Sequence, residues 1–129
     1  MSRKQITSPN AAPPGGSYSH AIEANGFLYT AGCGPQSVET GEIVGETIAE
    51  QTRQTLENLS AILAERGLDF SHVVKVTTHL ENVLADFAEY DAVYREYFVE
   101  PYPARTTVGS DLARILVEID VVAVIPQDA

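Results

Sequence analysis

Basic residues are scarce in this sequence of 129 amino acids. Eight lysines and arginines stand against eighteen aspartates and glutamates, which gives a formal net charge of −10. Proteins that bind nucleic acids use Lys and Arg side chains to neutralise phosphates. We therefore expect neither DNA nor RNA as a partner.

Cysteine and long apolar runs are also scarce. The single cysteine, Cys33, excludes a disulfide within the chain. No stretch approaches the about 20 apolar residues that span a bilayer, and residues 1–5 lead into no apolar signal segment. We therefore expect a soluble, cytoplasmic protein without a membrane partner.

Metal-binding patterns are missing as well. The three histidines, His20, His72 and His79, show no ligand spacing such as His-x-x-x-His. We therefore expect no metal site. Apolar residues, in contrast, make up 44% of the sequence, which is enough to build one hydrophobic core. The length fits one domain that comprises residues 1–129.

The N-terminal half predicts a hairpin followed by a helix. Residues 19–24 and 27–31 read as strands, and Asn25-Gly26 between them favours a type I′ turn. Thr47 and Glu50 have the spacing of a capping box, in which a hydroxyl and a carboxylate bond exposed amides at a helix start. The helix is expected to end near Arg66, before Gly67. Its apolar stripe consists of Ile48, Leu56, Leu59, Ile62 and Leu63.

The C-terminal half predicts a strand, a second helix and two further strands. Residues 73–80 are rich in β-branched side chains, which favour a buried strand. Asp86 and Glu89 repeat the capping pattern and predict a helix from there to about Phe98. Its aromatic positions, expected to pack on the sheet, are Phe87, Tyr90, Tyr94, Tyr97 and Phe98. This order of elements predicts an α+β fold with the two helices on one face of a sheet.

Two charged residues in the last two predicted strands are candidate catalytic groups. Arg105 begins one strand, after Pro101 and Pro103, and Glu118 interrupts the most apolar run of the chain. A guanidinium grips a carboxylate in two places, and a glutamate in apolar surroundings gains a pKa suited to moving protons. Together they suggest a pocket that binds a small carboxylate and hydrates a group beside it.

A purely structural interpretation of the same residues remains open from the residues alone. Arg105 can pair with a nearby acid, and Glu118 shares a strand face with Asp120, so both acids can point to solvent. Cys33, in a glycine-rich turn, is a candidate nucleophile, but a lone cysteine is more often a small packed residue.

Apolar residues occur on both faces of the last predicted strand. Val117, Ile119, Val121 and Ala123 alternate with Leu116, Val122 and Val124. Two helices cover only one face of a sheet, so the other face needs a different cover. Self-association is the simplest expectation.

Several segments, in the same order and over nearly the whole chain, resemble the reactive intermediate deaminase family, also called the RidA/YjgF family. Residues 16–21, Gly-Ser-Tyr-Ser-His-Ala, resemble the family's Gly-Pro-Tyr-Ser-Gln-Ala segment. Residues 29–32 stand at the family's Ser-Gly turn, and residues 50–59 are similar to its first helix. Pro-Ala-Arg-Thr at 103–106 and Val-Glu-Ile at 117–119 match its two signature strands.

The resemblance implies the chorismate-mutase-like α+β fold, with a mostly antiparallel sheet, and a homotrimer whose sites lie at subunit interfaces. It implies a cofactor-independent 2-iminobutanoate/2-iminopropanoate-type deaminase, which hydrolyses reactive enamines and imines to 2-keto acids and ammonia. Carried over by position, Arg105 would bind the substrate carboxylate and Glu118 would orient or activate the attacking water. Tyr18 would line the pocket, and Gly32 would lend backbone groups.

The sequence departs from the family pattern at four further positions near the expected site. The usual serine before the glycine is Ala31, the glutamine after it is Cys33, the asparagine of the second helix is Asp91, and a position that is often cysteine is Thr107. These changes would alter which substrate side chain fits or remove activity on the small archetypal imines. The alternative function is a non-catalytic trimer that binds small carboxylates or acts as a chaperone. A third is the ribonuclease activity attributed to some relatives, which the charge disfavours.

Overall fold

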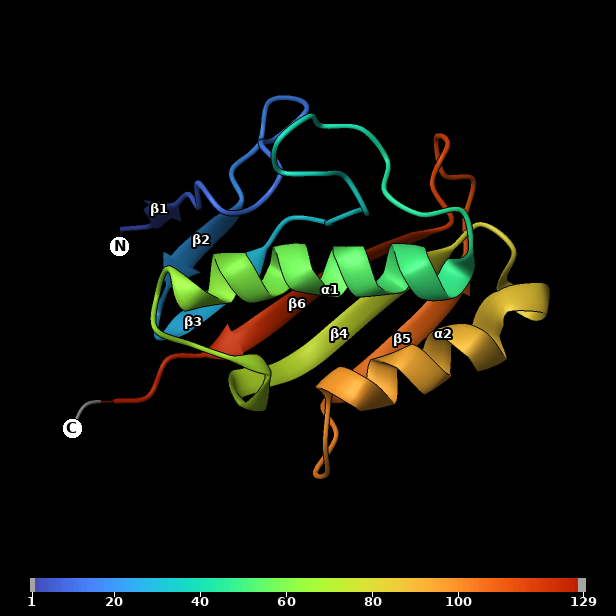
Figure 1. Ribbon diagram of the computed structural model, residues 1–129. Helices are drawn as coiled ribbons and strands as arrows, with labels where there is room; N and C mark the ends of the chain where they lie inside the picture. Colours follow the sequence, from blue (N-terminus) through green and yellow to red (C-terminus); the bar gives the residue numbers. More distant parts are fainter. Residues whose placement is uncertain (1, 128–129) are drawn as a thin grey trace.

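The computed structural model describes residues 2–127 and contains a six-stranded sheet with two long helices on one face (Figure 1). The helices are α1 (Ile48–Ala64) and α2 (Val83–Tyr97), and a 3-10 helix, η1 (Phe70–His72), precedes β4. The strands, in their order across the sheet, are β1 (Lys4–Ile6), β2 (Ala21–Ala24), β3 (Phe27–Thr30), β6 (Val117–Val124), β4 (Val73–Leu80) and β5 (Ala104–Gly109). The α+β class is confirmed.

The turn between β2 and β3 has the expected geometry. Asn25 and Gly26 both have positive φ, at 52° and 81°, as a type I′ turn requires. The turn pairs Ala24 with Phe27 in an antiparallel hairpin. The three-residue edge strand β1, which pairs with β2, was not predicted from the sequence.

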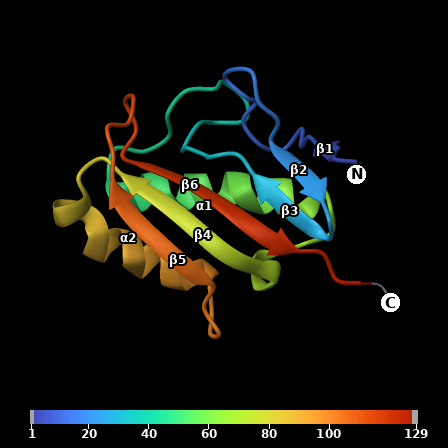
Figure 2. The ribbon, with the colours of Figure 1, turned by 180° about the vertical axis from the view of Figure 1, so that it is seen from behind.

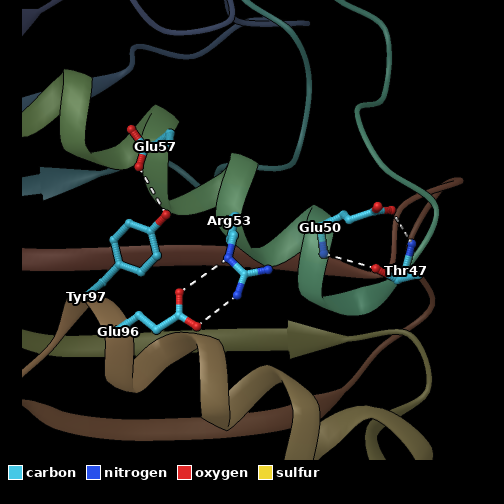
Figure 3. Close-up of polar contacts among 6 residues, drawn as sticks. All are labelled: Thr47, Glu50, Arg53, Glu57, Glu96 and Tyr97. Carbon is cyan, nitrogen blue, oxygen red and sulfur yellow. Dashed lines mark hydrogen bonds and ion pairs between the residues drawn. The ribbon is translucent and has the colours of Figure 1, made fainter.

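Helix α1 begins with the predicted capping box (Figure 3). The Thr47 hydroxyl accepts a hydrogen bond from the Glu50 N–H at 3.1 Å, and the Glu50 carboxylate accepts one from the Thr47 N–H at 3.2 Å. Gly67, with φ +72°, follows the helix end and has the left-handed conformation that favours glycine. The five residues of the predicted apolar stripe are all buried.

Helix α2 starts earlier than predicted. Its first residue is Val83, so Asp86 already lies in the first helical turn, and the capping box proposed for Asp86 and Glu89 is wrong. Asn82 is the N-cap residue, although its side chain makes no capping hydrogen bond. Of the five aromatic positions, Tyr97 is half-buried but packs against the core, whereas Phe87 differs from expectation because it is 38% exposed.

Polar contacts join the two helices at the surface (Figure 3). Arg53 of α1 and Glu96 of α2 form an ion pair at 2.8 Å. The Tyr97 hydroxyl donates a hydrogen bond to Glu57 at 3.0 Å. Below these contacts, Tyr90, Tyr94 and Phe98 fill the space between α2 and the sheet.

Strands β4 and β5 form the one parallel pair among the described strands, and α2 makes the crossover between them. A parallel pair needs such a crossover, and the helix must lie on a face of the sheet. This arrangement places β5 at the sheet edge with α2 against it.

The opposite face of the sheet carries no helix (Figure 2). Residues of β6 alternate between the two faces: Val117, Ile119, Val121 and Ala123 are buried under the helices. Their neighbours on the open face include Val124, which is 36% exposed, and the adjacent β3 residue Tyr29 is 45% exposed. Within residues 2–127, no helix is both long and apolar enough to cross a membrane.

Candidate active site

Arg105 lies on the helix-covered face of the edge strand β5. It pairs with Val76 of β4, which is fully buried, and directly paired residues point to the same face of a sheet. Its guanidinium carbon lies 4.4 Å from the ring centre of Tyr94 and 5.5 Å from the ring centres of Phe87 and Tyr90. The three aromatic rings of α2 therefore hold the guanidinium by cation–π contacts.

Asp91 of α2 binds the same guanidinium. The Nη1 of Arg105 donates a hydrogen bond to Asp91 Oδ1 at 2.8 Å, and Arg95 Nη1 donates one to Asp91 Oδ2 at 2.6 Å. Burial acts to lower the pKa of Arg105, but the Asp91 hydrogen bond and the nearby tyrosines outweigh it and raise that pKa. Arg105 is therefore permanently charged. Burial raises the pKa of Tyr94 to about 12, so the phenol stays protonated and neutral.

A cavity of about 410 Å³ opens beside Arg105. Its walls are Asp91, Tyr94, Arg95, Tyr102, Pro103 and Arg105. Within it, two guanidinium groups face one carboxylate, so the local charge is positive although the whole chain is strongly acidic. Such a cavity suits a small organic anion whose uncharged part is apolar and can pack against the aromatic rings.

Glu118 lies on β6 and faces the other side of the sheet. Its partner across the β4–β6 ladder is His79, whereas its neighbours Val117 and Ile119 are fully buried under the helices. The carboxyl group packs directly over Gly32, where a Cβ atom would come within 2.9 Å of Glu118 Cδ. Only glycine leaves room for the carboxylate in this position.

A second cavity, of about 450 Å³, contains Glu118. Tyr18, Ala31, Gly32 and Cys33 also line it, as the residues predicted for substrate binding. Among residues 2–127, the N–H and C=O of Gly32 make no hydrogen bond, so both remain available to a ligand. The Tyr18 hydroxyl accepts a hydrogen bond from the Gly15 N–H at 2.9 Å, which folds the glycine-rich loop over the ring.

The structure therefore divides the predicted site residues into two groups. Arg105 and Asp91 line one cavity, and Glu118 lines the other with Tyr18, Ala31, Gly32 and Cys33. Because Arg105 and Glu118 point to opposite faces of the sheet, one chain does not bring them together. Thr107 lines neither cavity; it pairs with Thr78, whose hydroxyl bonds Tyr90.

Cys33 has the environment of a packed residue. Its backbone exchanges two hydrogen bonds with Ile119, at 2.8 and 2.9 Å, and its side chain packs against the hydrophobic core. Burial, with smaller contributions from Glu118 and Asp120, raises the pKa of the thiol to about 12. A protonated thiol is a poor nucleophile, which favours the packing interpretation over the nucleophilic one.

Three residues that the sequence did not assign to the site also shape it. His20 accepts a hydrogen bond from the Ser8 N–H and donates one to the Ala12 carbonyl, at 3.0 and 2.8 Å, which fixes one neutral tautomer and anchors the proline-rich loop. Asn58 donates to the carbonyls of Gly34 and Gln36 and anchors the following loop. Arg95 contacts Asp91, and its spacing of four residues after Asp91 was the available signal.

No group of three potential metal ligands occurs among the described residues.

The fold and the two cavities define a class of protein: a small α+β sheet protein with an arginine pocket at one sheet edge and a glutamate–glycine pocket across the sheet. The family model for endoribonuclease L-PSP matches residues 9–125. A RutC family protein of Pyrococcus horikoshii is 46% identical over 123 residues, which cover 94% of this chain and 97% of that protein. The chain belongs to the RidA/YjgF family.

Two further relatives are informative. Reactive Intermediate Deaminase A, chloroplastic, of Arabidopsis thaliana is 42% identical over 106 residues, which cover 81% of this chain and 56% of that protein. A crystal structure of a Rid family protein of unknown function, YyfA from Yersinia pestis, has a TM-score of 0.90 at 35% identity and covers 96% of this chain and 100% of that one. The expected chorismate-mutase-like RidA/YjgF fold is thus confirmed.

Proposed function

We propose that the protein is a cofactor-independent deaminase that hydrolyses 2-imino acids, and the enamines that tautomerise to them, to 2-keto acids and ammonia. The 2-iminobutanoate/2-iminopropanoate type is the substrate class proposed. The observation that carries this proposal is Arg105, a guanidinium held over three aromatic rings at the wall of a small cavity. A relative named as a reactive intermediate deaminase supports the same reaction class.

We propose a homotrimer, as the family resemblance implies, in which each site lies between two subunits. Arg105 stands at the edge strand of the sheet, and Glu118 stands on the open face, so a second copy is needed to bring the two groups to one substrate. The open face carries the exposed apolar residues Tyr29, Val108 and Val124, which a second copy would cover.

The proposed mechanism uses three groups. Arg105 of one subunit binds the substrate carboxylate, and Glu118 of the next positions a water molecule and accepts its proton as the oxygen attacks the imine carbon. The Gly32 backbone stabilises the resulting carbinolamine. The imine reacts in its protonated form, so the carbinolamine carries a neutral amine. Glu118 returns the proton to this amine nitrogen, and the carbinolamine hydroxyl gives its proton to Glu118 as the C–N bond breaks, which releases ammonia and the 2-keto acid. An enamine substrate is first protonated at carbon to give the imine.

The alternative is a non-catalytic trimer that binds small carboxylates or acts as a chaperone. The contact of Asp91 with Arg105 favours weak anion binding and is compatible with this alternative. Substitution Glu118→Gln separates the two functions, because it removes the proton acceptor and leaves Arg105 unchanged. The deaminase predicts loss of turnover with 2-keto acid binding retained; unchanged turnover would refute the role of Glu118.

The test of the proposed reaction is a competition assay. An amino-acid oxidase generates 2-imino acids in the presence of semicarbazide, and an active deaminase lowers semicarbazone formation. We expect the unmodified protein to lower it and Arg105→Ala to restore it. Arg53→Ala is the matched control, since it removes a surface arginine and its ion pair with Glu96 away from both cavities. No effect of the folded protein on any imine would refute the proposal.

A further inference from the structure

The position of Asp91 creates a difficulty for carboxylate binding at Arg105. Asp91 is an internal carboxylate in hydrogen-bond contact with the guanidinium that is proposed to bind the substrate carboxylate. A carboxylate and a guanidinium prefer a bidentate arrangement, with two parallel N–H···O bonds. An aspartate free to adopt that arrangement would occupy Arg105 and exclude the substrate.

The structure shows the Asp91 carboxylate divided between two arginines. Oδ1 accepts from Arg105 at 2.8 Å, and Oδ2 accepts from Arg95 at 2.6 Å. Arg105 uses only Nη1 for this contact, and within residues 2–127 its Nε and Nη2 donate to no carboxylate. Among the described residues, the remaining N–H donors of Arg105 are therefore not paired with an acid and can bind a ligand carboxylate.

We infer that Arg95 is a positioning residue that keeps Asp91 in single contact with Arg105 and so keeps Arg105 available to the substrate carboxylate. Arg95 acts through Asp91 and touches no reacting atom. This inference rests on the proposed function, since it concerns the same carboxylate-binding pocket.

A simpler explanation of the Asp91–Arg95 pair is helix stabilisation. The two residues are four apart on α2, and Arg95 stands in its last turn, where a cation interacts favourably with the helix dipole. Helix stabilisation alone, however, predicts that Arg95→Ala leaves the affinity for a carboxylate ligand unchanged, and it predicts no dependence of that affinity on the charge of Asp91.

The experiment measures the affinity of the full-length protein for 2-oxobutanoate by calorimetric titration. Arg95→Ala should weaken binding about fivefold or more, because Asp91 can then bind Arg105 through both of its oxygens and occupy donors that the ligand carboxylate needs. Arg95→Lys should restore most of the affinity, since an ammonium also holds Oδ2. In the Asp91→Asn background, Arg95→Ala should change the affinity less than about twofold, because the competing charge is gone. Arg53→Ala, which removes an equal charge, should leave the affinity unchanged.

A crystal structure of Arg95→Ala supplies a readout that does not depend on turnover. Both Asp91 oxygens on Arg105 would support the inference, and an unmoved Asp91 would overturn it. Equal weakening by Arg95→Ala with and without Asp91→Asn would also overturn it, since Arg95 would then act as an independent charge. Failure of the unmodified protein to bind 2-oxobutanoate, with its fold intact, would instead refute the proposed function together with the inference.

Discussion

Substitution of Gly32 by alanine tests how closely Glu118 is positioned. The added Cβ would lie 2.9 Å from Glu118 Cδ and 3.1 Å from both Cγ and Oε1. These distances are shorter than normal carbon–carbon contacts, so the Glu118 side chain must move. It is a flexible side chain at the wall of a cavity, and we therefore expect only a small loss of stability.

The effect of Gly32→Ala on catalysis should be much larger than its effect on stability. A misplacement of about 1 Å in a catalytic group lowers rates roughly 100-fold. We expect kcat in the semicarbazide competition assay to fall by about that factor, while affinity for 2-oxobutanoate changes little, because Arg105 is untouched. Circular dichroism melting provides the stability measurement.

A second variant separates this explanation from a general disturbance of the loop. With Glu118→Ala in place, there is no carboxyl group for the new methyl group to displace, so Gly32→Ala should lower the residual activity no further. Activity of Gly32→Ala close to that of the unmodified protein would refute the positioning argument. So would an equal further loss in the Glu118→Ala background.

Three other predictions follow from single residues. Arg105→Lys should weaken 2-oxobutanoate binding about 10-fold or more, measured by calorimetry, because an ammonium lacks the planar fork that stacks on Tyr94; unchanged affinity would contradict this role. Cys33 should resist iodoacetamide at pH 8 in the native protein and react after unfolding in urea, since its raised pKa, about 12, keeps the thiol protonated. Because the pKa of the thiol is higher in the folded than in the unfolded protein, its contribution to stability should be complete below about pH 8.5 and be lost as the pH rises toward 12. Rapid native alkylation would refute it. Thr47→Ala should lower the free energy of unfolding by about 1 kcal/mol without changing kcat, since it removes the helix cap; urea unfolding with no loss of stability would contradict this.

Local signals in the sequence predicted much of the fold. Asn25-Gly26, the Thr47–Glu50 capping box and the β-branched run 73–80 each determine structure through neighbouring residues, and the structure has all three. Strand β1 has no such signal, because its three residues gain their structure from pairing with β2. The start of α2 was misplaced because a carboxylate in the first turn and an N-cap residue give similar patterns.

The candidate site was predicted as a set of residues but not as an arrangement. Arg105 and Glu118 were identified by residue type and by family resemblance. Their opposite orientations, however, depend on the strand register, which is determined by pairing between distant segments and leaves no local signal in the sequence. The ion pair of Asp91 with Arg105 depends on packing of α2 against an edge strand distant in sequence. Arg95, in contrast, stands four residues after Asp91 on the same helix, so its contact with Asp91 had a local signal, and it was missed because the spacing alone does not show that Asp91 contacts Arg105.

Complementation between two strongly impaired variants tests the central claim most directly. Arg105→Ala and Glu118→Ala each remove one half of every site, and each variant alone should keep only a small residual activity. If a site takes Arg105 from one subunit and Glu118 from the next, a mixed trimer contains one intact site.

Equal amounts of the two variants should therefore recover activity when they are unfolded together and refolded. About three quarters of the trimers are then mixed, and each mixed trimer has one working site of three. The expected activity is about one quarter of that of the unmodified protein. The same variants mixed without unfolding serve as the control for subunit exchange. Recovery near one quarter is the predicted result. No activity above that of the separate variants, in refolded trimers shown to be mixed, would contradict a site shared between subunits.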